Sequence, residues 1–139
     1  MDKVYIIDDD RNIVESMSIV LKSHGYKVYA QYDEKNIINN LISEKPDIII
    51  LDVIFPENPD AGFDIAREIR KNGQTAGIPV IMLSAINEKG DYAVTFSNRD
   101  RDDSWLPVNE FIEKPIRPDQ LLRKVKETLE NAIWKSIKK

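Results

Sequence analysis

Several short apolar runs of the sequence end in side chains that could take part in chemistry. Asp8 and Asp9 follow the first run, Asp52 ends another, and Ser84 and Lys114 follow two later runs. Carboxylates that are held close together repel one another unless a cation intervenes, and hard oxygen ligands favour Mg²⁺, which often shares its site with a phosphate. An ammonium and a hydroxyl group alongside would donate to phosphoryl oxygens. The set predicts a site that holds or transfers a phosphoryl group, and no glycine-rich loop points to a bound nucleotide as the phosphate source.

These side chains can meet only if the apolar runs form one sheet. Short β-rich runs alternate along the chain with segments whose apolar residues recur at helical spacing. The strands are expected at 4–7, 27–31, 47–52, 79–83 and 110–113, and the helices at 12–24, at 33–45, around Ile65, Ala66 and Ile69, and from about Pro118 with Leu122, Val125, Leu129 and Ile133 on one face.

The alternation of strand and helix predicts a doubly wound α/β fold, with a parallel sheet covered by helices on both faces. Residues 48–51 are four consecutive aliphatics between Asp47 and Asp52, a pattern typical of a central strand that is buried on both sides. Ligands of such sheets bind at the carboxyl ends of the strands. We therefore expect the acids, the serine and the lysine to converge on one edge.

Local signals predict where two of the helices begin and end. Asp10 is expected to cap the first helix, and His24-Gly25 to close it with a left-handed residue. Asp33 is expected to cap the second helix, which must end before Pro46.

Composition narrows the class of protein. The chain has 139 residues, a length that suits one domain. Its 20 Lys+Arg against 24 Asp+Glu give a net charge of −4, which gives no sign of nucleic-acid binding. The absence of cysteine excludes disulfides and thiolate metal sites, and the single His24 excludes a multi-histidine metal site. Without a membrane-length apolar run or a signal segment, we expect a cytoplasmic protein that does not contact the membrane.

The ordered set Ile7-Asp8-Asp9, Asp52, Ser84-Ala85 and Lys114-Pro115 closely resembles the receiver domains of two-component response regulators, over residues 3–129. The resemblance implies a flavodoxin-like, five-stranded parallel sheet of order 2-1-3-4-5. It also implies a stand-alone receiver domain over 1–130, similar to chemotaxis regulators, in which 131–139 complete the last helix and no output domain follows.

The resemblance implies a role for each site residue. Asp52 would accept the phosphoryl group, Lys114 would pair with Asp52 and then with phosphoryl oxygens, and Ser84 would bond a phosphoryl oxygen. Ser84 and Phe111 would be the switch residues. The Mg²⁺ ligands would be Asp9, Asp52, the main-chain carbonyl of Ile54 and, through water, Asp8.

The function implied is that of a phospho-accepting receiver in a two-component phosphorelay. Its donor would be a sensor histidine kinase or a histidine phosphotransfer protein, and its phosphorylation would switch binding to a downstream protein that the sequence does not identify. It would not be an enzyme beyond catalysing its own phosphorylation and dephosphorylation. No helix-turn-helix follows, so direct DNA binding is not expected.

Two other functions stay open. The complete set Asp8, Asp9, Asp52, Ser84 and Lys114 argues against a phosphorylation-independent interaction module, but the enlarged segment 87–109, whose mixed-charge run at 98–103 has no apolar period, leaves it open. The loop 55–61 also looks long. An Mg²⁺-dependent aspartyl phosphatase of the haloacid dehalogenase type would use a similar site. That enzyme needs an acid two residues after its nucleophile, where this chain has Ile54.

Overall fold

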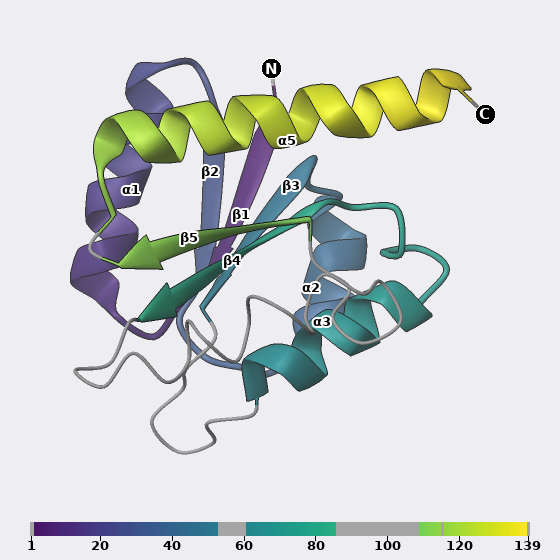
Figure 1. Ribbon diagram of the computed structural model, residues 1–139. Helices are drawn as coiled ribbons and strands as arrows, with labels where there is room; N and C mark the ends of the chain where they lie inside the picture. The colour runs from purple at the N-terminus through teal and green to yellow at the C-terminus, as the bar shows by residue number, and fades with distance from the viewer. Residues whose placement is uncertain (1, 53–60, 86–108, 115, 139) are drawn as a thin grey trace.

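The structure is a computed structural model that describes residues 2–52, 61–85, 109–114 and 116–138 (Figure 1). All five strands lie where the sequence predicts them. The strands are β1 (Lys3–Ile7), β2 (Lys27–Gln31), β3 (Ile48–Asp52), β4 (Val80–Ala85) and β5 (Glu110–Lys114), and the helices are α1 (Arg11–Ser23), α2 (Ile37–Glu44), α3 (Ala61–Lys71) and α5 (Pro118–Lys138).

The strands form one parallel sheet of order β2-β1-β3-β4-β5, which confirms the expected doubly wound fold. One apolar cluster packs α1 and α5 against one face of the sheet, and a second packs α2 and α3 against the other. Figure 1 shows α1 and the pair α2 and α3 on opposite sides of the strands. Every residue of β3 is buried, as expected for the central strand. This packing fixes β1 and β3 side by side at the centre of the molecule.

Both ends of α1 match their predicted caps. The Asp10 carboxylate accepts hydrogen bonds from the main-chain N–H groups of Asn12 (3.0 Å) and Ile13 (3.2 Å). At the other end Gly25 has φ +90°, and its N–H donates to the carbonyl of Lys22 at 3.1 Å. The positive φ explains the glycine, because side chains with a Cβ are strained in that conformation.

The start of α2 differs from the prediction. Asp33 does not cap the helix; its carboxylate instead accepts the N–H of Lys35 at 3.0 Å, which closes a turn ahead of the helix. Asn36 then adopts a left-handed conformation with φ 55°, so the helix cannot begin before the residue that follows it. Its end is as predicted, since Lys45 is left-handed and precedes Pro46.

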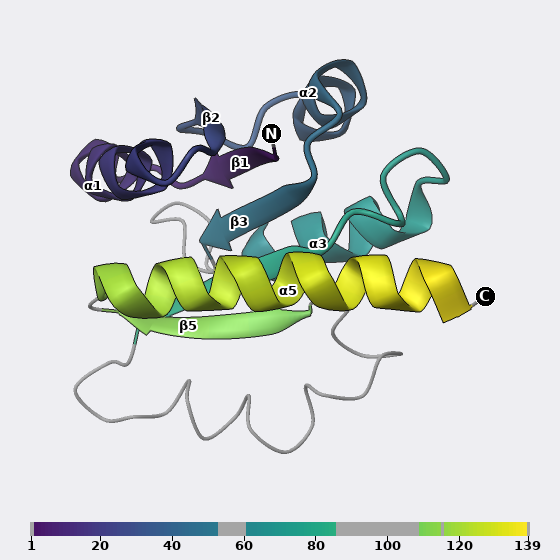
Figure 2. The same cartoon turned by 90° about the horizontal axis from the view of Figure 1, so that it is seen from above.

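The buried face of α5 is shifted by one residue from the prediction at its start. Leu121, Val125 and Leu129 are buried, whereas Leu122 is only partly buried. Figure 2 shows α5 alongside β5, with its C-terminal end extending past the strand. The helix runs without a break through residues 130–131, and the side chain of Ile133 lies outside the described residues. None of the described helices is long and apolar enough to cross a membrane.

Candidate metal centre

Three carboxylates meet at the carboxyl edge of the two central strands. Asp8 directly follows β1, Asp52 is the last residue of β3, and the two strands are paired up to Ile7 and Leu51. Each of Asp8, Asp9 and Asp52 offers a carboxylate oxygen, and these oxygens all lie within 4.8 Å of one another. The structure therefore brings together the three acids that the sequence singled out.

The burial of this cluster is uneven. Asp8 is 0% exposed and Asp52 3% exposed, while Asp9 is the most accessible of the three. Asp8 is held from two sides, because its N–H donates to the carbonyl of Gln31 (3.1 Å) and its carboxylate accepts the N–H of Asp10 (2.9 Å). Two buried carboxylates with a third beside them repel one another, and a bound cation would offset that repulsion.

The donor set fits Mg²⁺. The ion takes oxygen ligands at about 2.0–2.1 Å in an octahedron, so two ligands on opposite sides are separated by about 4.2 Å. Oxygens that lie within 4.8 Å of one another can therefore bind one ion, some directly and others through water. Waters would complete its coordination, as is usual for this ion.

Two further predicted site residues reach the same edge through their strands. Asp52 pairs with Leu83, the residue before Ser84, and Lys114 pairs with Ala85. The side chains of Ser84 and Lys114, and all of Ile54, lie outside the described residues, as do segments 53–60 and 86–108 that cover the two long loops.

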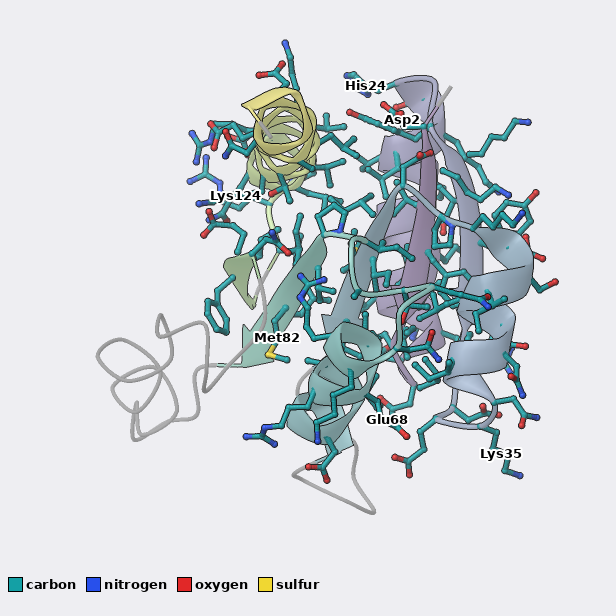
Figure 3. The ribbon with its side chains drawn as sticks, turned by 90° about the vertical axis from the view of Figure 1, so that its right-hand side faces the viewer. Asp2, His24, Lys35, Glu68, Met82 and Lys124 are labelled. Atoms are coloured by element: carbon teal, nitrogen blue, oxygen red, sulfur yellow. The ribbon has the colours of Figure 1, made fainter. Side chains whose placement is uncertain are left out.

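Phe111 lies on β5 opposite Met82, and its ring is half-buried against the core on the α2 and α3 side of the sheet. Figure 3 shows Met82 on β4 on the same side as α3. Phe111 is three residues from the end of β5, so a shift of its ring would occur on the strand that carries Lys114.

Sequence reasoning missed a buried polar network beside Asp8. The side-chain amide of Gln31, 7% exposed, accepts hydrogen bonds from the Tyr5 hydroxyl (2.8 Å) and the Asn40 amide (3.0 Å), and donates to the carbonyl of Lys35 (2.6 Å). Burial raises the pKa of the Tyr5 phenol above 10.0. A glutamine as the final residue of β2 is the only sequence signal of this network.

A cation, Arg11, begins α1 two residues after Asp9. The Arg11 guanidinium lies over the ring of Tyr32, with its carbon 4.0 Å from the ring centroid.

His24 lies at the end of the molecule away from the carboxylates. Figure 3 shows it with Asp2 at the amino-terminal end of the sheet, and Lys35 at the opposite end. This position agrees with the interpretation of His24 as a helix-end residue.

A groove of about 300 Å³ opens between α1 and the start of α5. Its lining is mainly apolar, with two small polar side chains from α1. The lining residues are Asn12, Ile13, Ser16, Met17, Val20, Ile116, Pro118 and Leu121.

The sheet order and the acidic edge define a flavodoxin-like doubly wound α/β protein with a carboxylate centre at its strand ends. The family model of the response regulator receiver domain matches residues 4–126. The chain therefore belongs to the receiver domains of response regulators, which take part in two-component signalling.

Solved structures with similar folds include other response regulators. A candidate response regulator from Chloroflexus aurantiacus is 26% identical with a TM-score of 0.74, over 93% of this chain and 98% of that one. The chemotaxis protein CheY4 of Vibrio cholerae is 24% identical with a TM-score of 0.70, over 92% and 98%. NtrX of Brucella abortus has a TM-score of 0.78 at 23% identity, but this chain, covered over 97%, spans only 28% of it.

Proposed function

We propose that Asp52 is the phospho-acceptor of a two-component phosphorelay and that its phosphorylation switches binding to a downstream protein. The observation that carries the proposal is the cluster of Asp8, Asp9 and Asp52 at the strand ends of a receiver domain. The chain would act as a signalling switch, not as an enzyme that turns over a separate substrate.

In the proposed reaction, a carboxylate oxygen of Asp52 attacks the phosphorus of a phosphohistidine. The P–N bond breaks, its electron pair goes to the imidazole nitrogen, and the phosphoryl group is left on Asp52 as an acyl phosphate. Lys114 and Ser84 donate hydrogen bonds to the phosphoryl oxygens. Mg²⁺, when bound by Asp9, Asp52, the carbonyl of Ile54 and, through water, Asp8, supplies positive charge that offsets the repulsion between carboxylate and phosphoryl group.

The switch would act through β4 and β5. Phosphorylation adds about 1.5–2 negative charges at Asp52, enough to bias an element that has two arrangements. Ser84 lies one residue beyond the partner of Asp52 on β4, and Phe111 lies on the next strand with its ring half-buried. Movement of Ser84 toward the phosphoryl group would therefore be coupled to the position of the Phe111 ring.

A protein donor needs a contact surface next to Asp52, and the groove between α1 and α5 is well placed for one. The groove begins at Asn12, three residues after Asp9, and its apolar lining suits a helix with an apolar face. We propose that the phosphohistidine-bearing protein docks there. Replacement of Ile13 by alanine should slow transfer from a phosphorylated histidine phosphotransfer protein and leave phosphorylation by acetyl phosphate unchanged.

A matched control for this variant exists on the opposite face of the sheet. Ile38→Ala also removes part of a partly buried isoleucine, but from the α2 and α3 side. Its transfer rate from the protein donor should equal that of the parent. Equal rates for Ile13→Ala and Ile38→Ala would rule out docking in the groove.

The proposed function is tested by intact mass after incubation with Mg²⁺ and acetyl phosphate, beside an Asp52→Asn control. The parent should gain the mass of one phosphoryl group and the control none. A folded, Mg²⁺-binding parent that gains nothing from acetyl phosphate or a phosphohistidine donor would favour the phosphorylation-independent module. Sustained hydrolysis of small phosphoesters would favour the phosphatase.

A further inference from the structure

We propose that Arg11, held in place by Tyr32, is a cation at the rim of the carboxylate cluster that attracts the dianionic phosphoryl group of an incoming donor. The inference rests on the proposed function and concerns how the donor group reaches Asp52. The recognised chemistry is the same whether the group arrives on phosphohistidine or on a small acyl phosphate.

The position of Arg11 is not explained by helix stability. It is the first residue of α1, where the partial positive charge of the helix N-terminus disfavours a cation, and the first turn of α1 contains no acidic residue. Asp10, its neighbour, already accepts two N–H groups of that turn. An arginine at this point therefore has a cost to the helix that another role would offset.

Tyr32 fixes the side chain on the β2 side of the cluster. The Arg11 guanidinium carbon is 4.0 Å from the Tyr32 ring centroid, which is the geometry of a cation–π contact. Tyr32 directly follows Gln31, whose carbonyl accepts the N–H of Asp8 at 3.1 Å. The side-chain amide of Gln31 is itself held by Tyr5 and Asn40. The ring thus belongs to the residue that directly follows β2, next to the main chain that bonds to Asp8.

The negative charge around Asp52 explains why a cation would be useful at this place. The chain carries a net charge of −4, and Asp8, Asp9 and Asp52 gather three carboxylates at the point where a dianion must arrive. Lys114 is the last residue of β5, the outer strand on one side of the sheet. Arg11 contacts Tyr32, which follows β2, the outer strand on the other side. A cation there lowers the repulsion that a phosphoryl group meets on its approach.

A rim cation has opposite effects on the two ligands of the site, and this makes the idea sharply testable. Removing the charge of Arg11 should tighten the binding of Mg²⁺ and slow phosphorylation. If the separation between the guanidinium and a divalent ion is taken as about 10 Å, Coulomb's law in water with salt screening gives about a threefold effect at 10 mM ionic strength and less than about twofold at 0.1 M. General damage to the fold would weaken both instead.

The experiment compares the parent with Arg11→Gln, Arg11→Glu and Lys22→Gln. Lys22 is exposed in the last turn of the same helix, about 16 Å further along the axis, so its variant removes the same charge away from the site. Each protein is titrated with Mg²⁺ and then phosphorylated by acetyl phosphate and by a phosphorylated histidine phosphotransfer protein, at 10 mM and 0.1 M ionic strength.

For Arg11→Gln we expect about threefold tighter Mg²⁺ binding and about threefold slower phosphorylation by both donors at 10 mM. Arg11→Glu should show about the square of each effect, and Lys22→Gln should match the parent. Replacement of Tyr32 by leucine should give a smaller, salt-dependent change in the same directions.

Three results would overturn the inference. The first is an Arg11→Gln variant with unchanged Mg²⁺ affinity and phosphorylation rate, and the second is a loss of both that does not depend on salt. The third is slower phosphorylation by the protein donor alone, which would mean that Arg11 contacts the partner and not the phosphoryl group. If the parent takes no phosphoryl group from either donor, the proposed function fails. The Mg²⁺ titrations of the same variants then still decide whether Arg11 acts on the cluster.

Discussion

Replacement of Asp9 by asparagine should stabilise the protein in the absence of metal and weaken its response to Mg²⁺. Asp9 is the right member of the cluster to change, because it is the most accessible and its loss leaves the two buried carboxylates in place. The substitution keeps the size of the side chain and removes one of three neighbouring negative charges.

The magnitude follows from the spacing of the carboxylates. Two unit charges 4.8 Å apart repel by about 0.9 kcal/mol in water, and physiological salt reduces this to about 0.5 kcal/mol. Asp9 faces two such neighbours, so Asp9→Asn should raise the free energy of unfolding by about 1 kcal/mol. For a domain of this size that is about 3–4 °C in melting temperature.

Addition of Mg²⁺ should reverse the order of the two proteins. At a concentration ten times its dissociation constant, an ion that binds only the folded state stabilises it by about 1.4 kcal/mol. The parent gains this amount. Asp9→Asn starts about 1 kcal/mol more stable, so the order reverses if the variant gains less than about 0.4 kcal/mol, which corresponds to about tenfold weaker binding of Mg²⁺. We expect at least this loss, because the substitution removes a proposed ligand. Thermal melts of both proteins with and without Mg²⁺ measure the crossing, and Glu127→Gln, which removes an exposed carboxylate of α5, is the control.

The reasoning is refuted if Asp9→Asn melts below the parent without metal. It is refuted equally if the variant gains as much from Mg²⁺ as the parent does. Either result would mean that the proximity of the three carboxylates produces neither repulsion nor a metal site.

Three further predictions concern the frame around the site. Asp10→Ala should lose about 1 kcal/mol of stability in urea titrations and leave the affinity for Mg²⁺ unchanged, because Asp10 caps α1; a loss of Mg²⁺ affinity would make it a ligand. Gln31→Leu should lose about 2–4 kcal/mol in the same assay, because the Tyr5 hydroxyl and the Asn40 amide lose a buried partner; a loss under 1 kcal/mol would contradict this. Burial raises the pKa of Tyr5 in the folded protein above its usual value of 10.0, so the contribution of Tyr5 to stability should be constant below pH 10 and fall above it, and Tyr5→Phe should reduce that fall.

The central strand β3 was the clearest to predict, because a parallel strand buried on both faces is apolar along its whole length. Residues 48–51 are all aliphatic, without the apolar and polar alternation of a half-exposed strand. The acids Asp47 and Asp52 on either side mark where the strand begins and ends. The caps at Asp10 and Gly25 were predictable for a different reason: each depends on main-chain groups within a few residues.

The errors arose where distant contacts decide local structure. Asp33 has a good cap residue type, but its carboxylate accepts from Lys35 and from the Gln31 amide, whose position is fixed by Tyr5 on another strand. In α5, helical spacing is compatible with either Leu121 or Leu122 facing the sheet. Only the placement of the helix against the sheet selects Leu121.

The candidate site divides in the same way. The acids were found because strand ends share an edge, a rule that needs only the order of elements. The stack of Arg11 on Tyr32 was not found, because it requires the pairing of β1 with β2, in which Ile7 lies opposite Gln31.

In the proposed function, and among the described residues, the choice of donor comes from α1 and the start of α5 and not from the carboxylates. Asp8 and Asp52 lie at the ends of β1 and β3, whose residues are buried in the centre of the sheet, so they cannot adapt to different partners. The helix α1, in contrast, contributes one wall of the apolar groove and the cation Arg11, and its N-terminus is fixed to the cluster through Asp10. Variation along the exposed face of α1 would therefore change which protein delivers the phosphoryl group. Acetyl phosphate does not contact the groove, so the rate of its reaction would change only with the charge at Arg11.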